Sequence, residues 1–253
     1  MRENTPADAA GTPSSGVISV VIPTLDSAKS VDAAIRSAPP GADVVVVDGG
    51  SRDGTADAAA RAGARVEIAP PGRAVQMNAG AHAARGDILV FLHADCRLPR
   101  AAAGQVTSIL AQPRVVGGWF PQRIEGGGRL FRFGARRANQ RARWLDLPYG
   151  DQAIFTTRRA FAEVGGFPEE PIFEDAGLAR RLRRLGRLEP AGAAVTTGTE
   201  HWERLGPVPT AVLDYLALGA WLAGMPPAWI ARLYFPLQRG SVGRTPREPE
   251  HGA

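Results

Sequence analysis

Cysteine, lysine and long apolar runs are scarce in this sequence of 253 residues, and the scarcity of cysteine and of apolar runs each excludes a class of protein. A single cysteine, Cys96, rules out an internal disulfide, and with it a disulfide-stapled secreted scaffold or a cysteine-rich zinc or iron–sulfur site. The apolar run 216–225 near the C-terminal end is far shorter than the roughly 18 residues that a membrane-spanning helix needs. Lys29 is the only lysine, so the net charge of +5 rests on arginine and by itself says little about partners.

The rest of the composition is that of a globular protein. Hydrophobic residues make up 44% and charged residues 22% of the chain, which argues against a disordered protein and against a coiled coil. We expect residues 1–16, which are rich in proline and glycine and lack a signal-peptide core, to be a disordered leader, and 238–253 to be a disordered tail. The expected localisation is cytoplasmic, with contact to the inner face of the membrane as an open alternative.

Apolar runs alternate with helix-compatible segments in the first hundred residues. The runs are apolar on nearly every residue, as in strands covered on both faces, and the segments between them are rich in alanine. The expected strands are 17–22, 44–47, 65–69 and 88–92, and the expected helices are 27–37, 55–62 and 74–84. A strand followed by a helix, repeated, predicts an α/β fold with a mostly parallel central sheet flanked by helices.

The alternation is less regular after residue 99. The expected helices there are 101–111, 129–144, 176–185 and two short ones within 208–237, and the expected strands are 115–120, 153–157 and 193–197. The two short helices are broken at Pro226-Pro227. They either cap the domain, form the face of a homodimer or rest on a membrane.

Polar or turn-forming residues follow three of the expected strands. Pro23-Thr24-Leu25-Asp26 follows the first, 48–55 follows the second, and His93-Ala94-Asp95 follows the third. Ligands of open parallel sheets bind beyond the carboxyl ends of the strands. A single carboxylate there is ordinarily a helix cap or a turn former, but acidic residues at three strand ends predict a shared site for a polar, metal-bound ligand.

The glycine-containing stretch at 48–55 is neither Gly-x-Gly-x-x-Gly nor Gly-x-x-x-x-Gly-Lys-Ser/Thr, which disfavours dinucleotide oxidoreductases and P-loop ATPases. Three segments in this order resemble the family 2 glycosyltransferases of GT-A fold: Val-Ile-Pro-Thr-Leu-Asp at 21–26, Val-Val-Val-Asp-Gly-Gly-Ser-Arg-Asp-Gly-Thr at 45–55 and Glu-Asp at 174–175. The resemblance covers roughly residues 18–202. It implies one domain over 17–237, with a nucleotide-binding half (17–98), an acceptor and catalytic half (99–206) and C-terminal helices (207–237).

The resemblance also implies a nucleotide-sugar donor, with UDP as the expected nucleotide. The residues matched to donor binding are Pro23, Thr24, Asp26, Asp48, Gly49, Arg73, Gln76, Asn78, His93, Ala94 and Asp95. For Gln76 and Asn78, an ordinary helix surface is the alternative. Segments 72–80 and 150–155 further resemble a small stand-alone subgroup associated with arsenosugar biosynthesis, in which Gly150, Asp151 and Gln152 would line the donor-sugar or acceptor pocket.

A divalent cation, Mg2+ or Mn2+, is implied because it neutralises the charge of the departing nucleoside diphosphate. Asp95 matches the last carboxylate of the family's Asp-x-Asp motif, whose first member is here His93. A histidine can ligate manganese or hydrogen-bond the ribose or diphosphate. His201 lies where many GT-A enzymes have a histidine that completes the metal shell, and simple packing beside Trp202 is the alternative.

An inverting transfer needs a base opposite the leaving group, and the resemblance assigns this role to Asp175, with Glu174 orienting Asp175 or the acceptor. Capping of the helix that they begin is the plain alternative. The expected reaction is therefore metal-assisted transfer of a sugar to a hydroxyl acceptor. Two alternatives stay open: a nucleotidyltransferase, which would favour a glycine-rich loop with a basic residue after the first strand, and a catalytically silent nucleotide-sugar-binding protein.

Arginines recur at helical spacing in 129–144, with Arg129, Arg132, Arg136 and Arg143 on one face. This stripe is either a solvated face or a binding surface for an anionic or lipid-linked acceptor or an acidic lipid headgroup. The acceptor interpretation places Arg132 and Arg136 in the acceptor site. Nucleic acid is disfavoured, because few aromatic residues interleave with the stripe and no recognised nucleic-acid module accompanies it.

Overall fold

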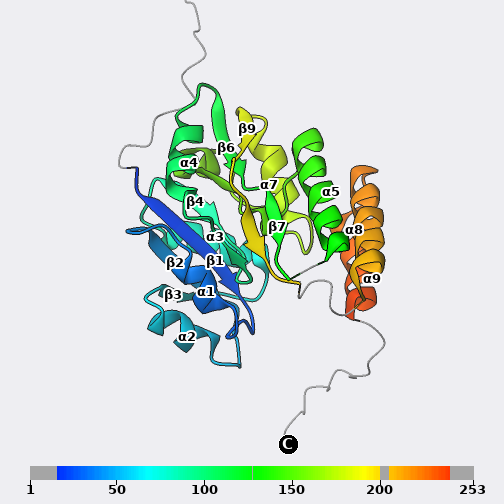
Figure 1. Cartoon of the computed structure of the whole chain (residues 1–253), viewed down its shortest axis with the longest axis horizontal. Helices are drawn as coiled ribbons and strands as arrows, with labels where there is room; N and C mark the ends of the chain where they lie inside the picture. The colour runs from blue at the N-terminus through cyan, green and yellow to red at the C-terminus, as the bar shows by residue number, and fades with distance from the viewer. Residues whose placement is uncertain (1–15, 127, 200–204, 240–253) are drawn as a thin grey trace, which may run out of the picture. The chain divides into compact units, whose positions relative to one another are not determined.

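The computed structural model describes residues 16–126, 128–199 and 205–239 (Figure 1). The chain divides after Thr199 into two compact units. The single domain expected over 17–237 stays a prediction. The expected leader lies outside the described residues except for Gly16. The last helix continues to Arg239, so the expected start of a disordered tail at 238 is two residues too early.

A seven-stranded sheet forms the centre of the first unit, in the order β3-β2-β1-β4-β8-β6-β9 (Figure 1). Its strands are β1 (Ile18–Thr24), β2 (Asp43–Asp48), β3 (Arg65–Ile68), β4 (Ile88–Phe91), β6 (Val115–Trp119), β8 (Phe155–Thr157) and β9 (Arg187–Pro190). β8 runs antiparallel to both of its neighbours, and the other pairs are parallel. The prediction of an α/β fold with a mostly parallel central sheet is confirmed.

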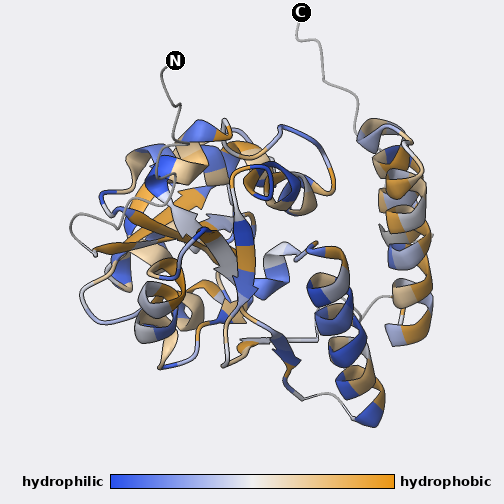
Figure 2. Cartoon of the chain, turned by 90° about the horizontal axis from the view of Figure 1, so that it is seen from above, coloured by the Kyte–Doolittle hydropathy of each residue, from blue (hydrophilic) through white to orange (hydrophobic). Residues whose placement is uncertain are grey.

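Helices cover both faces of this sheet. They are α1 (Val31–Arg36), α2 (Thr55–Arg61), α3 (Arg73–Ala83), α4 (Ala102–Leu110), α5 (Arg129–Leu145), α6 (Arg158–Glu163) and α7 (Glu174–Leu182). Val20 and Val46 pack with residues of α1, α2 and α4, whereas Val21 and Val47 pack with residues of α3, α6 and α7. Successive residues of a strand point to opposite faces, so burial on both faces explains the continuous apolar runs, which take the hydrophobic colour in Figure 2.

A second, three-stranded sheet has the order β5-β10-β7, with β5 (Cys96–Arg97), β7 (Gln122–Ile124) and β10 (Val195–Thr197). Of these strands, the sequence predicted β10 but not β5 or β7. Two elements of the first unit, β9 and α6, were not predicted either. These elements are two to six residues long, which is too short for a hydrophobic period to be recognisable.

The second unit contains α8 (Pro207–Leu222) and α9 (Pro227–Arg239), as expected on either side of Pro226. The two helices contact each other, and the Tyr234 hydroxyl on α9 donates a hydrogen bond to Asp214 Oδ1 on α8 at 2.5 Å. Among the described helices, none combines the length and the apolar character that crossing a bilayer requires.

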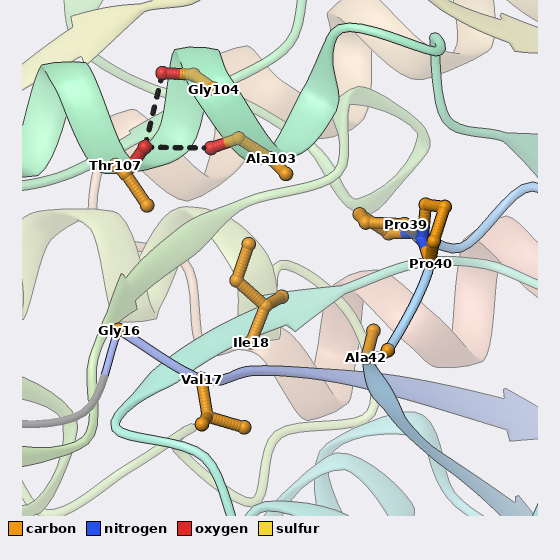
Figure 3. Close-up of a pocket in the computed structure, with 10 residues that line it drawn as sticks. Gly16, Val17, Ile18, Pro39, Pro40, Ala42, Ala103, Gly104 and Thr107 are labelled. Atoms are coloured by element: carbon orange, nitrogen blue, oxygen red, sulfur yellow. Dashed lines mark hydrogen bonds between the residues drawn. The ribbon is translucent and has the colours of Figure 1, made fainter.

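A hollow of about 240 Å3 lies at the start of β1, against the α1–β2 connection and α4 (Figure 3). Its lining residues are uncharged, and the Thr107 hydroxyl in it already donates to the carbonyls of Ala103 and Gly104. The hollow lies at the amino end of β1, opposite the sheet edge at which ligands of such folds bind. The functional site is therefore expected at the other edge of the sheet.

Candidate active site

The polar residues that follow β1, β2 and β4 lie at the carboxyl edge of the large sheet. β1 ends at Thr24 and β2 at Asp48, and their parallel pairing sets these two residues side by side. Residues 93–95 follow β4, which is parallel to β1. The short 3-10 helix η1 (Gly150–Gln152) precedes the antiparallel β8, and the Phe91 amide donates to the Ile154 carbonyl at 2.9 Å, so η1 reaches the same edge.

The Asp48 carboxylate organises the loop that follows β2. It accepts hydrogen bonds from the amides of Gly50 and Ser51 at 3.1 and 2.9 Å, from the Ser51 hydroxyl, and from the Thr24 hydroxyl at 3.2 Å. Burial raises the pKa of Asp48, but these hydrogen bonds outweigh burial and leave the pKa below its ordinary value. Asp48 is therefore a fixed anion in a preformed loop.

Asp26 joins the β1 loop to the β2 loop. Its backbone has a positive φ of 51°, its amide donates to the Ser51 hydroxyl, and its carboxylate accepts from the Arg52 amide, both at 2.9 Å. Pro23 lies buried within β1. The expected donor-binding residues of the first two strands thus form one rim held by its own hydrogen bonds.

Gln76 and Asn78 of α3 bond to backbone groups of other segments. The buried Gln76 amide nitrogen donates to the carbonyls of Thr24 and Val47, both at 2.8 Å, and a Cβ on Gly49 would lie only 3.2 Å from it. Asn78 exchanges two hydrogen bonds with the backbone of Phe167, at 3.0 and 2.9 Å. The helix-surface alternative is wrong for Gln76, which ties together the ends of β1 and β2.

Glu174 and Asp175 begin α7, and both are buried, with 1% and 6% of their surface exposed. Arg73, at the start of α3, places its Nε 2.8 Å from Glu174 Oε1 and keeps nearly half of its side chain exposed. Two adjacent buried carboxylates repel each other, so Arg73 compensates part of this repulsion. This ion pair was not predicted from the sequence.

Gly150 brings His93 and Asp175 together. Its amide donates to Asp175 Oδ2 at 2.8 Å, and a Cβ at this position would overlap His93 Nε2 and lie 2.7 Å from the same carboxylate oxygen. Any larger residue at this position would displace one of the two side chains. Residues from the loop after β4, from η1 and from α7 thus meet at one point.

The pKa of Asp175 is raised from an ordinary value of 3.8 to about 8. Burial is the largest cause, and the charges of Glu174 and Asp151 add to it, whereas Arg73 and the Gly150 amide act in the opposite direction. Such a carboxyl exchanges a proton near neutral pH, which is what a general base requires.

A network that the sequence did not reveal holds η1 in place. Asn139 of α5 bonds to the backbone of Gln122 at 2.8 and 3.0 Å, and its Oδ1 also accepts from the side chain of Gln152 at 3.1 Å. Arg141 donates to Gln152 Oε1 at 3.3 Å and stacks on the Tyr149 ring, with its Cζ 3.5 Å from the ring centroid. No motif marks these residues, because their partners are remote in sequence.

Asp151 projects from η1 toward Gln122. With its nitrogen turned toward Asp151, the Gln122 amide donates to the carboxylate oxygens at 3.2 and 2.5 Å. The charges of Asp95 and Asp151, after burial, raise the pKa of the Cys96 thiol, and this thiol donates to Asp95 Oδ1 at 3.3 Å. The Asp95 carboxylate therefore lies beside this buried thiol, directly after the buried Ala94.

The donor chemistry of this corner fits a hard divalent cation. Mg2+ binds through one or two carboxylates and takes its remaining ligands from phosphate oxygens and water, so it needs no cage of protein side chains. Asp95 meets this requirement, and within the described ranges no group of three or more His, Cys, Asp or Glu side chains is arranged to hold a metal. His201, the third expected ligand, lies outside the described residues.

Arg132 and Arg136, expected in the acceptor site, lie on α5. Both are exposed on α5, whereas Asn139 and Arg141 of the same helix bond to η1. Their assignment to the acceptor site stays a prediction.

The comparisons with known proteins agree with this geometry. The model of glycosyl transferase family 2 matches residues 19–165, which is more than half of the chain. An uncharacterised glycosyltransferase of Mycobacterium tuberculosis strain H37Rv is 35% identical over 96 residues, which are 38% of this chain and 43% of that protein. The match thus spans less than half the length of this curated relative.

Solved structures show the same fold at lower identity. A mannosyltransferase of Pyrobaculum calidifontis, in complex with GDP-Man and Mn2+, has a TM-score of 0.60 at 20% identity and covers 94% of this chain and 72% of its own. Glucosyl-3-phosphoglycerate synthase of M. tuberculosis, in complex with Mn2+, UDP-glucose and phosphoglyceric acid, has a TM-score of 0.59 at 22% identity and covers 87% and 83%. The family match sets aside the nucleotidyltransferase alternative, and the chain belongs to glycosyl transferase family 2.

Proposed function

We propose that this glycosyltransferase transfers a sugar from a UDP-sugar to a hydroxyl acceptor with inversion, and that Asp175 is the general base. The observation that carries the proposal is the contact of the buried Asp175 with Gly150, beside His93, at the edge of the sheet where the loops after β1, β2 and β4 end. A base at this place faces the position that a donor held by those loops would occupy. The solved relatives that bind GDP-Man or UDP-glucose support a nucleotide-sugar donor.

The nucleoside end of the donor belongs at the rim formed by Pro23, Thr24, Asp26, Asp48 and Gly49. Asp48 is ionised there and its loop is already ordered by hydrogen bonds, so little reorganisation opposes binding. Gln76 and Asn78 affect donor binding indirectly, because Gln76 bonds to the backbone at the ends of β1 and β2 and Asn78 bonds to the backbone of Phe167. Their contribution is therefore to position the rim and the turn before α7.

The diphosphate belongs between Arg73 and Asp95. Arg73 is half exposed, and its charge would stabilise the leaving group. Asp95 and His93 would hold Mg2+ or Mn2+, with His201 as a further candidate ligand. When bound, this cation supplies charge neutralisation to the departing diphosphate.

The acceptor belongs beside Asp175, between α7 and η1. Asp175 takes the proton of the attacking hydroxyl. Glu174 forms the ion pair with Arg73 and so holds Arg73 near Asp175. Gly150, Asp151 and Gln152 would line the pocket of the donor sugar or the acceptor, because the network through Gln122 and Asn139 fixes them at this edge.

Replacement of Asp175 by asparagine tests the assignment of the base. Asparagine keeps the size and the ability to accept a hydrogen bond from Gly150 but cannot take a proton. We expect UDP to bind as before in calorimetric titration, and transfer to fall by about 10²- to 10⁴-fold, the range for removal of a general base. Turnover is measured as UDP, GDP or TDP released from a panel of nucleotide sugars.

Asp57→Asn, an exposed carboxylate on α2, is the matched control and should leave both readouts unchanged. Normal transfer by Asp175→Asn would show that another group is the base. Loss of UDP binding along with transfer would instead place Asp175 in the donor site.

A further inference from the structure

The outer face of α5 differs from every other described helix surface in its charge. The helix carries six arginines and no aspartate or glutamate in 17 residues. Its buried residues, Ala135 and Ala142, are small, and Asn139 and Arg141 bond to η1. Figure 2 shows α5 as a mostly hydrophilic helix with isolated apolar positions.

Five of the arginines lie on the exposed part of the helix: Arg129, Arg132, Arg136, Arg137 and Arg143. Among the described residues, no carboxylate lies within 4.0 Å of the guanidinium group of Arg129, Arg132, Arg136 or Arg143, whereas Arg183 and Arg187 on other elements have such partners. Within the part of the chain that the structure describes, the positive charge of these four arginines is therefore not compensated by ion pairs.

Large apolar side chains interrupt the arginines. Phe133 is 62% exposed and Trp144 is 71% exposed, and the two positions are eleven residues apart, which corresponds to about three turns, or roughly 16 Å along the axis. Leu130 and Leu145 near the two ends are about half exposed. A face that presents both guanidinium groups and aromatic rings matches the boundary between phospholipid headgroups and acyl chains.

We propose that the outer face of α5 binds the surface of an anionic phospholipid membrane. The arginines contact the headgroup phosphates, and Phe133 and Trp144 insert at the level of the acyl chains. A single-stranded nucleic acid would use a groove with aromatic platforms, whereas this face is a convex helix that also exposes leucines, which bases do not need. This inference goes beyond the proposed function and does not depend on it.

The membrane would then lie next to η1. The same helix that presents the arginines outward bonds inward to Gln152 through Asn139 and Arg141, so the surface and the candidate active site share one rigid element. An acceptor embedded in or adsorbed to the membrane would meet the site without the protein changing its position.

Sedimentation of the full-length protein with vesicles tests this inference. We expect binding to vesicles that contain phosphatidylglycerol, weakening with added salt, and no binding to vesicles of phosphatidylcholine alone. Arg132→Gln combined with Arg136→Gln should lower the partition coefficient about thirty-fold, since each basic residue near an anionic surface contributes roughly fivefold. Phe133→Ser combined with Trp144→Ser should also lower it, at unchanged charge.

Arg61→Gln combined with Arg159→Gln removes the same charge from exposed positions on α2 and α6 and should change the partition coefficient less than twofold. An equal loss in this control would show non-specific attraction and overturn the proposal. Three further results would overturn it. The first is no binding to anionic vesicles, and the second is tighter binding of single-stranded RNA than of vesicles. The third is that Leu216→Ser combined with Leu233→Ser, in the second unit, abolishes vesicle binding while the α5 variants bind vesicles as the wild type does. UDP binding, measured in parallel, reports the donor site separately.

Discussion

Two aspartates at the same edge of the sheet, Asp48 and Asp175, both expose little surface, but the protein groups packed around them shift their pKa values in opposite directions. Asp48 is 2% exposed and accepts hydrogen bonds from two amides and two hydroxyls, which hold its pKa below the ordinary value although burial raises it. Asp175 is 6% exposed, accepts from one amide and lies beside Glu174, and its pKa is about 8. Burial alone therefore does not decide whether a carboxyl is charged.

The opposite pKa shifts of the two aspartates indicate that the two halves of the site have different roles. The loops after β1 and β2 hold a permanent anion and bond to each other, as a preformed binding rim requires. The corner made by η1 and α7 concentrates carboxylates with few donors, as a proton-accepting site requires. Three experiments, in decreasing order of expected effect, would overturn or refine this comparison.

The largest effect is expected from Gly150→Ala. The added methyl group would overlap His93 Nε2 and press on Asp175 Oδ2, so it should displace the base without touching the rim around Asp48. We expect transfer to fall by about 10²-fold or more, because a displacement of about 1 Å at a reacting group has this effect. Gly104→Ala on α4, where nothing lies within 4 Å of the new methyl group, is the matched control.

Calorimetric titration with UDP should show that Gly150→Ala retains nucleotide binding. Unchanged transfer in this variant would mean that the contact of η1 with Asp175 has no part in the reaction.

The pH dependence of stability should separate Asp48→Asn from Asp175→Asn by sign. The folded-state pKa of Asp48 is lowered, so this carboxylate contributes stability above the unfolded pKa of 3.8, and the contribution is lost as the pH falls through the folded pKa. The folded-state pKa of Asp175 is raised to about 8, so its contribution is complete below 3.8 and is lost as the pH rises through about 8.

Urea unfolding at pH 4, 6 and 9 measures both effects. Asp48→Asn should be less stable than the wild type at pH 6 and 9, and Asp175→Asn should gain stability relative to the wild type from pH 4 to pH 9. Parallel pH dependences of the two variants would contradict the electrostatic difference described above.

The smallest effect is expected from Gln122→Ala, which removes the amide that donates to Asp151. The backbone bonds between Gln122 and Asn139 persist, so only the orientation of one carboxylate is released. We expect kcat/KM to fall about tenfold, and the free energy of unfolding to fall by about 1 kcal/mol, the usual worth of one hydrogen bond. Gln140→Ala on the exposed side of α5 should change neither quantity, and a larger loss in this control would point to α5 as a whole.

The elements predicted from the sequence share a physical property. β1, β2 and β4 are covered on both faces and therefore have apolar residues at nearly every position, which is visible without a structure. β7 and β9 are short and partly exposed, and they are strands only because β10 and β6 pair with them. Pairing of segments remote in sequence has no local signal.

The residues of the candidate site likewise fall into those that the sequence predicted and those that only the folded chain brings together. The acidic residues after the strands and at 174–175 were recognisable because a family resemblance attaches to short contiguous motifs. Gln76 was expected to contact the donor, but its place between the ends of β1 and β2 depends on how α3 packs on the sheet, where Gly80 permits close approach to Val21 and Val47. The ion pair of Arg73 with Glu174 and the bonds of Gln122 and Asn139 depend on packing in the same way.

By itself the sequence determined the central strands, the family and the acidic residues at the strand ends, because apolar runs and short motifs are properties of contiguous residues. Only the tertiary structure decided which of two chemically identical aspartates holds its charge and which binds a proton near neutral pH. The reason is that a pKa depends on the donors, charges and solvent around a carboxyl, and at this site those neighbours come from strands, loops and helices far apart in the chain.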